Sequence, residues 1–242
     1  MNQFFEIFKW LLAISFFVAL LLFTNQRQHA QNMYLKKIII EESNDNFINQ
    51  KIVLDFLQDN AIYFDSILPN NYSKEDLENL LISHPSIKDV EVFGSQKGDV
   101  NILIEQKQAV VRLKGNAGDY YLDEFGKRME LCSNYTPNLA VVTGDFTVND
   151  HISIFQFISH INKSDFWRSQ ITQVHFDQGE VFLIPRIGSH KVNIGSFSNI
   201  IDKLNNLYHF YKVVMPHKGW QAYSDINLSF ENQIVCLKNI EK

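Results

Sequence analysis

An unbroken apolar run near the start of the chain, WLLAISFFVALLLF at residues 10–23, restricts the fold more than any other feature. Counted outward, the apolar stretch covers residues 4–24, which is close to the roughly 20 residues that an α-helix needs to cross a bilayer. The run therefore predicts one transmembrane helix at residues 10–24. The residues expected to hold this anchor in the membrane are Trp10, Leu11, Phe16, Phe17, Leu21 and Phe23.

A cleaved signal peptide is the alternative to a retained anchor, because it also combines a charged start with a short apolar core. The sequence that follows, TNQRQHAQ, has no small-x-small pair for signal peptidase, which favours retention. Charge leaves the orientation ambiguous, since Lys9 precedes the run while Arg27 and the lysines at 36–37 follow it. Because the head at residues 1–9 is short, we expect the C-terminal side to cross the membrane.

The remaining chain of about 210 residues is long enough for one large domain or two small ones. The net charge is −5, and residues 1–30 hold one acidic and two basic residues, so the rest carries −6. That acidic balance argues against nucleic acid or an anionic lipid surface as the main partner. Two cysteines, Cys132 and Cys236, are too few for a disulfide scaffold, and one disulfide or two free buried thiols both remain open.

The sequence between residues 35 and 105 predicts a small α+β domain. The expected elements are a strand at Leu35–Ser43, a helix at Gln50–Asp59, a helix starting at Ser73, and a β-hairpin whose strands carry Ile87, Val90 and Val92, then Val100, Ile102 and Ile104. Asn49 is a suitable N-cap for the first helix, and Ser73 with Asp76 resembles a capping box for the second. This order of elements packs two helices on one face of a three-stranded sheet. It is the order of a POTRA domain, although other small α+β domains share it.

From residue 109 onward the pattern changes to strands and tight turns, which indicates a mixed α/β domain with an antiparallel sheet. The expected strands lie at Ala109–Leu113, Tyr120–Leu122, Met129–Leu131, Leu139–Gly144, Ile171–Phe176, Val181–Pro185, Tyr223–Phe230 and Gln233–Leu237. A turn at Asp123–Gly126 needs positive φ at Gly126. Asp150 is a candidate cap for a helix through His160, and a longer helix spans Ser198–Val213. Its apolar stripe is expected to comprise Ile201, Leu204, Tyr208 and Tyr211.

No enzyme motif occurs in the chain, which has no P-loop, GxSxG, HExxH or CxxC. Its eight histidines are scattered at spacings that match no metal site. The closest histidines in the sequence are His151, His160, His175 and His190. Asp123 and Glu124 are adjacent acids, but Asp favours turns, and turn formation accounts for Asp123. The sequence therefore predicts a non-enzymatic protein without a catalytic, metal or cofactor site.

Two other classes of function fit part of the pattern. A periplasmic chaperone or outer-membrane assembly factor with POTRA domains would hold unfolded strands at its sheet edges. It predicts repeated POTRA units or a C-terminal barrel, whereas residues 35–105 have no second copy in the sequence. A membrane-anchored cell-wall hydrolase would need a nucleophile or paired acids in a pocket, and the sequence supplies neither.

Five segments, in order behind the apolar run, carry a resemblance to a known family. They are HPSIKDVEV at 84–92, NILIEQKQAVVRL at 101–113, YYLDEFGKRMEL at 120–131, LAVVTG at 139–144 and INLSFENQIV at 226–235. As an ordered set they resemble the bacterial cell-division family FtsQ/DivIB, in its Bacteroidetes-like form, over nearly the whole chain.

The resemblance implies a non-enzymatic scaffold of the divisome, located in the inner membrane at the septum. It implies a cytoplasmic head at residues 1–9, one membrane span, a POTRA domain at 35–106 and an FtsQ-type β domain at 109–238 in the periplasm. In the family, the last strands of the β domain bind the small coiled-coil proteins FtsB and FtsL by adding a strand of the partner to the sheet edge. The matching positions here are Leu228, Ser229, Phe230, Gln233, Ile234 and Val235.

The chain departs from proteobacterial members at this edge, because Ser229 and Phe230 stand where those members carry an arginine and a tyrosine. The charge-assisted contact and the aromatic hydroxyl are therefore missing. The chemistry of an edge strand favours the same site. An exposed edge has unpaired N–H and C=O groups, which are either protected from pairing or bind a partner strand. Only one lysine, Lys238, lies near it. The side chains of Phe230 and Ile234 would then select which strand is added. Because strand side chains alternate between two faces, it is equally possible that both side chains face the core.

Overall fold

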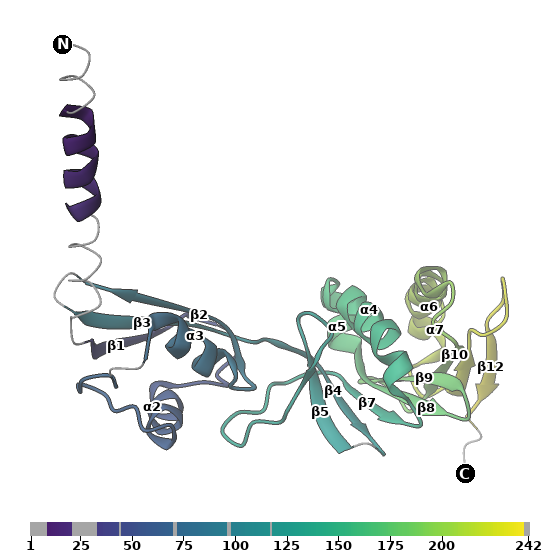
Figure 1. The fold of residues 1–242 in the computed structure, drawn as a ribbon. Coiled ribbons are helices and arrows are strands. Elements are labelled where there is room, and N and C mark those ends of the chain that lie inside the picture. Colours follow the sequence, from purple (N-terminus) through teal and green to yellow (C-terminus); the bar gives the residue numbers. More distant parts are fainter. Residues whose placement is uncertain are drawn as a thin grey trace. The chain divides into compact units, whose positions relative to one another are not determined.

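The computed structural model of the chain describes residues 9–20, 33–43, 45–69, 72–95, 98–116 and 118–239 (Figure 1). The chain forms two compact units. The first comprises Met1–Glu42 and Ile48–Gln106, and the second comprises Ser43–Phe47 and Lys107–Lys242.

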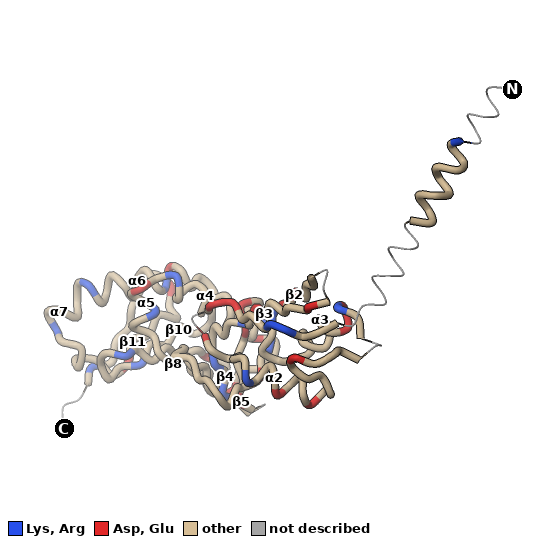
Figure 2. The backbone as a smooth tube through the Cα atoms, turned by 90° about the vertical axis from the view of Figure 1, so that its left-hand side faces the viewer, with Lys and Arg blue, Asp and Glu red and all other residues tan. Residues whose placement is uncertain are grey.

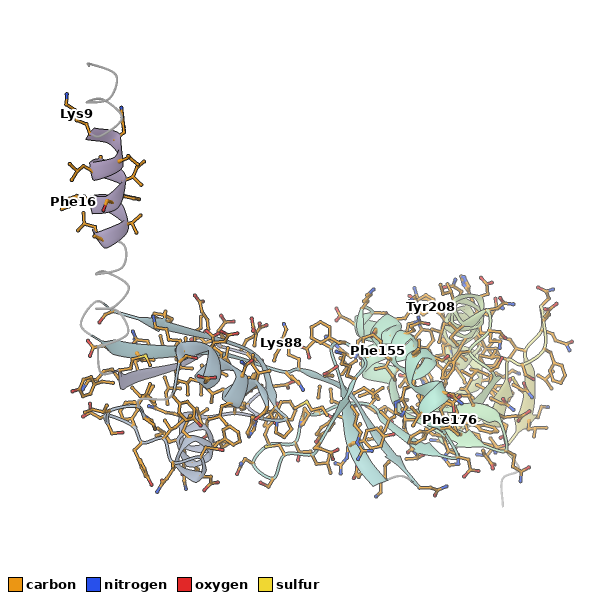
Figure 3. The ribbon with its side chains drawn as sticks, viewed as in Figure 1. Lys9, Phe16, Lys88, Phe155, Phe176 and Tyr208 are labelled. Carbon is orange, nitrogen blue, oxygen red and sulfur yellow. The ribbon has the colours of Figure 1, made fainter. Side chains whose placement is uncertain are left out.

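Residues 9–20, which overlap the predicted transmembrane helix, are helical. Figure 2 shows no charged residue along this helix beyond Lys9 at its start. Its large apolar side chains are exposed, and Phe16 points away from the helix axis in Figure 3. Leu21 and Phe23 lie outside the described residues. Among the helices that the structure describes, none combines the length and the apolar character that a membrane span requires.

The first unit is a three-stranded sheet with two helices. Its elements are β1 (Tyr34–Ile40), α2 (Gln50–Asp59), α3 (Lys74–Ile82), β2 (Ile87–Gly94) and β3 (Asp99–Gln106). The strand order is β1-β3-β2, with β3 parallel to β1 and antiparallel to β2. The predicted order of strands and helices is confirmed.

Both helices of the first unit begin where their capping residues predicted. Asn49 accepts a hydrogen bond from the N–H of Ile52 at 3.0 Å, and Ser73 forms a reciprocal capping box with Asp76. The helices bury one apolar face each, with α2 in contact with β1 and α3 in contact with β2. The buried side chains are Val53, Leu57, Leu77, Leu81, Val100, Ile102 and Ile104. The α+β class is therefore correct for this unit.

The second unit is a nine-stranded sheet in the order β12-β11-β10-β9-β8-β7-β4-β5-β6. Its strands are β4 (Ala109–Gly115), β5 (Gly118–Asp123), β6 (Arg128–Met129), β7 (Val141–Gly144), β8 (Ile171–Asp177), β9 (Glu180–Pro185), β10 (Lys191–Gly195), β11 (Tyr223–Asn227) and β12 (Val235–Lys238). Its helices are η1 (Val148–Asp150), α4 (His151–Asn162), α5 (Asp165–Gln170), α6 (Ile200–Val213) and α7 (Met215–Lys218). Figure 1 shows α4, α5 and α6 along one side of this sheet.

The expectation of an antiparallel sheet is wrong for the second unit, because the sheet is mixed. β7 runs parallel to both β4 and β8, and β10 runs parallel to β11. The chain crosses from β7 to β8 through α4 and α5, and from β10 to β11 through α6 and α7. Parallel neighbours need a crossover of a dozen or more residues, usually helical, and both connections are of this kind.

Three local expectations for the second unit can be compared with the structure. The turn at Asp123 is confirmed, since its buried carboxylate accepts the N–H groups of Phe125 and Lys127, both at 2.9 Å. Asp150 does not cap α4, because its carboxylate accepts the N–H of Thr147 instead. Ile201 is exposed rather than part of the α6 stripe, whose buried members are Leu204, Leu207 and Tyr211.

Candidate functional site

The C-terminal hairpin forms one border of the nine-stranded sheet. β11 pairs with β10 on one side and with β12 on the other, and β12 is the last strand in the order. The connection turns at Glu231 and Asn232, where Asn232 has a φ of 57°. Asparagine tolerates this left-handed conformation better than most residues, so the turn is encoded locally.

The main-chain groups at the outer side of β12 can be assigned from the neighbouring strands. The N–H of Leu228 donates to the carbonyl of Asn193 at 2.7 Å, so the main-chain N–H of Leu228 points toward β10. Because successive residues of a strand alternate in direction, Asp225 and Asn227 point toward β12, opposite Leu237 and Val235. Cys236 lies between those two partners, and its N–H and C=O therefore point away from the sheet.

The side chains of β12 are more exposed than those of the strands inside the sheet. Val235 is 42% exposed and Leu237 is 61% exposed, whereas Ile226, opposite Cys236, is fully buried. Cys236 itself is half-buried on the side of the core. The edge thus offers open main-chain groups flanked by apolar side chains.

The structure separates the six predicted site residues by environment. Leu228 is buried in the core, while Ser229, Gln233 and Val235 are exposed and Phe230 is 50% exposed. β11 ends earlier than expected because the side-chain oxygen of Asn227 accepts the N–H of Ser229 at 2.8 Å.

Sequence reasoning did not select Cys236 and Leu237, which form the middle of the edge. The signal that could have found them is the alternation of faces through Val235–Lys238 directly after the turn.

A pocket of about 470 Å³ lies beside this edge. Its lining residues are Asn206, His209, Phe210 and Val213 from α6, and Asn232, Gln233 and Ile234 from the segment before β12. Ile234 is half-buried here against the core, and Val213 is 63% exposed. A segment that paired with β12 would therefore find an open, partly apolar hollow beside the start of the strand.

Other exposed edges are guarded or short. β6 has two residues, β2 carries Lys88, Asp89 and Glu91, and β1 carries Lys36 and Lys37 and is bridged at its start by Ile67. Charged side chains discourage the pairing of an edge with a foreign strand. β12 carries a single charge, Lys238, in four residues, and it is the least protected of these edges.

A cluster of three aromatic side chains packs next to the strands that precede β12. The ring of His190, just before β10, shares a hydrogen bond of 2.8 Å with the hydroxyl of Tyr211 on α6. It stacks on Trp220, just before β11, with the ring centroids 6.3 Å apart. Burial lowers the pKa of His190 and raises the pKa of Tyr211, so both groups stay neutral near neutral pH.

We expect the stability of the second unit to fall in acid because of His190. Burial holds its pKa below the ordinary value of 6.5, so below that pH the unfolded chain binds a proton that the folded chain does not. The stability that neutral His190 contributes is fully present above about pH 6.5, and it is lost as the pH falls toward the lowered pKa. Urea midpoints of the full chain from about pH 8 to about pH 5 should fall more steeply than those of His190→Gln. Burial also lowers the pKa of His151, but His151 is present in both proteins and cancels in the comparison. If the urea midpoints of the two proteins fell in parallel with pH, His190 would not be the cause.

No group of three or more His, Cys, Asp or Glu side chains arranged to hold a metal ion occurs among the described residues. Cys132 and Cys236 are both free thiols.

Two family models match the chain. The model described as "FtsQ/DivIB, C-terminal related" matches residues 108–237, and the model described as "POTRA-like domain" matches residues 35–105. No curated protein matches the chain.

Proposed function

Because the chain belongs to the FtsQ/DivIB family, whose C-terminal related model matches more than half of it, we propose that it is a non-enzymatic scaffold of bacterial cell division. The scaffold spans the inner membrane once through residues 10–24. Its N-terminus lies in the cytoplasm, and the POTRA domain and the β domain lie in the periplasm at the division septum. The apolar run supports the anchor, and the exposed apolar side chains of residues 9–20 are of the kind that lipid would cover.

The scaffold binds FtsB- or FtsL-like coiled-coil proteins by adding a strand of the partner to β12. A partner strand would bond to the outward main chain of Cys236 and lie against Val235 and Leu237. Phe230 and the pocket beside Ile234 would accept side chains next to that strand. The single observation that carries this proposal is that the least protected edge strand, β12, lies at the predicted end of the sheet.

Imaging of a fluorescent protein fused before Met1 in dividing cells tests the proposal. We expect a bright band at midcell, because the fused protein would fold in the cytoplasm and follow the divisome. The matched control carries the same fluorescent protein after Lys242, where a domain that fluoresces only in the cytoplasm should stay dark. A uniform envelope signal would favour the assembly-factor alternative, and the opposite pattern of bright and dark fusions would reverse the topology.

A further inference from the structure

A short loop in the first unit exposes three large apolar side chains. The loop joins α2 to α3 and is fixed at its ends by Ile62 and Leu68, which are 1% and 4% exposed. Between these buried residues, Tyr63 is 55% exposed, Phe64 is 43% exposed and Ile67 is 49% exposed. Three such side chains within five residues make a concentrated apolar surface, unlike the single exposed apolar residues that are normal in proteins.

The backbone of this loop is held in place by the start of β1. The N–H of Asp65 donates to the carbonyl of Leu35 at 2.9 Å, and the N–H of Leu68 donates to the carbonyl of Met33 at 2.7 Å. Ile67 also forms an isolated bridge with Tyr34. The exposure of the three side chains is therefore imposed by main-chain hydrogen bonds at defined positions.

The loop lies at the end of the unit where the chain arrives from the apolar run. Met33 and Tyr34, which the loop contacts, are the first described residues after that run. Ten residues, 24–33, separate the run from this point, and a chain of ten residues spans at most about 35 Å. If residues 10–24 lie in a bilayer, the chain keeps Met33, and the loop bonded to it, within about 35 Å of the surface of the same bilayer.

We propose that Tyr63, Phe64 and Ile67 insert into the interfacial layer of the membrane that holds the anchor. The proposal rests on the membrane anchor of the proposed function. Aromatic side chains favour the level of the lipid headgroups, where an apolar ring and a polar edge are both satisfied. Lys36 and Lys37 are exposed on the adjacent strand, and Lys36 pairs with Asp65 in the loop. Lys37 at this height can extend its ammonium group toward the headgroups.

The tether explains why three side chains suffice. Binding of the loop is an intramolecular event, so a weak affinity is raised by a high effective concentration. The contact is apolar, which agrees with the negative charge of the chain, and it should not need anionic lipid. Its consequence is that the first unit has a second point of attachment and a defined orientation at the membrane surface.

Fluorescence quenching by brominated lipid tests the proposal in the full chain. The chain is placed in nanodiscs of phosphatidylcholine with or without bromine on the acyl chains, in a Trp10→Phe background. Phe64→Trp reports on the loop. Ile82→Trp is the matched control, because Ile82 is similarly exposed at 44% but lies at the far end of α3. Trp167 and Trp220 of the second unit stay the same in every chain.

We expect the tryptophan at position 64 to lose emission in brominated lipid and to shift to the blue, while the tryptophan at position 82 does neither. Equal quenching at both positions, or none at position 64, would overturn the loop contact. The chain that retains Trp10 separates this outcome from a failure of the anchor. If Trp10 is quenched and the tryptophan at position 64 is not, only the proposed loop contact is wrong. If Trp10 is not quenched, the proposed membrane anchor is wrong as well.

Discussion

Replacing Cys236 with proline is expected to weaken the binding of a partner strand strongly and to leave the protein folded. Proline removes the N–H of Cys236, which points outward, and it leaves the bonds of Val235 and Leu237 to β11 in place. A partner carbonyl left without its donor at a buried interface costs about 1–3 kcal/mol, which weakens binding by roughly 5- to 150-fold. Copurification of FtsB- and FtsL-like proteins with the tagged full chain measures the loss.

Two matched variants show whether the outward N–H is responsible. Cys236→Val keeps the N–H and the half-buried apolar side chain, so it should retain binding. Leu237→Pro removes an N–H that points toward β11, so it should disrupt the hairpin and lower the urea midpoint. If Cys236→Pro binds as well as Cys236→Val, the partner does not add a strand to β12, and the exposed side chain of Phe230 becomes the next position to change.

The first unit shows how much local sequence signals can predict. Asn49 and Ser73 mark helix starts through hydrogen bonds to residues three positions away, and β3 alternates with period two along its whole length. All of these signals act over short distances in the sequence. They do not depend on where the remaining chain goes, and the structure follows them.

The second unit shows where such signals fail. The parallel pairs of β7 and β10 join residues that are far apart in the sequence, so no local pattern specifies them. β10 has five residues, the last of which is Gly195, and α5 has six residues. Both are stabilised by tertiary packing rather than by propensity.

The hairpin that carries the predicted site residues is present, but its first strand ends earlier than the prediction had it, and its role in binding stays a prediction. The prediction continued β11 through Phe230 because Leu228 and Phe230 alternate like strand residues. The side chain of Asn227 ends the strand instead, so Leu228 turns into the core and Phe230 out to solvent. The direction of each main-chain group at the edge depends on the pairing of β10 with β11, which only the structure reveals.

A second large effect is expected from Gly144→Ala at the end of β7. Gly144 has a φ of 96°, and a Cβ at this position would lie 1.9 Å from the carbonyl oxygen of Phe176 on β8. Either the parallel pair of β7 and β8 separates or Phe176 moves out of the core, where it packs against Phe146 and Phe197. Strained backbone and a backbone clash together should cost about 3 kcal/mol or more of the free energy of unfolding, measured by urea denaturation.

Gly179→Ala is the matched control for the close approach, because Gly179 has a φ of 83° but no atom within 4 Å of the added Cβ. Gly179→Ala introduces the backbone strain without the clash, so its free energy of unfolding should fall by about 1 kcal/mol. Equal losses in the two variants would show that the contact with Phe176 is not the cause. β7 and β8 lie in the middle of the sheet that ends at β12, so any loss of partner binding in Gly144→Ala should follow the loss of folded domain. Cys236→Pro should weaken binding while the circular dichroism spectrum stays native, and this contrast separates a binding edge from the sheet that supports it.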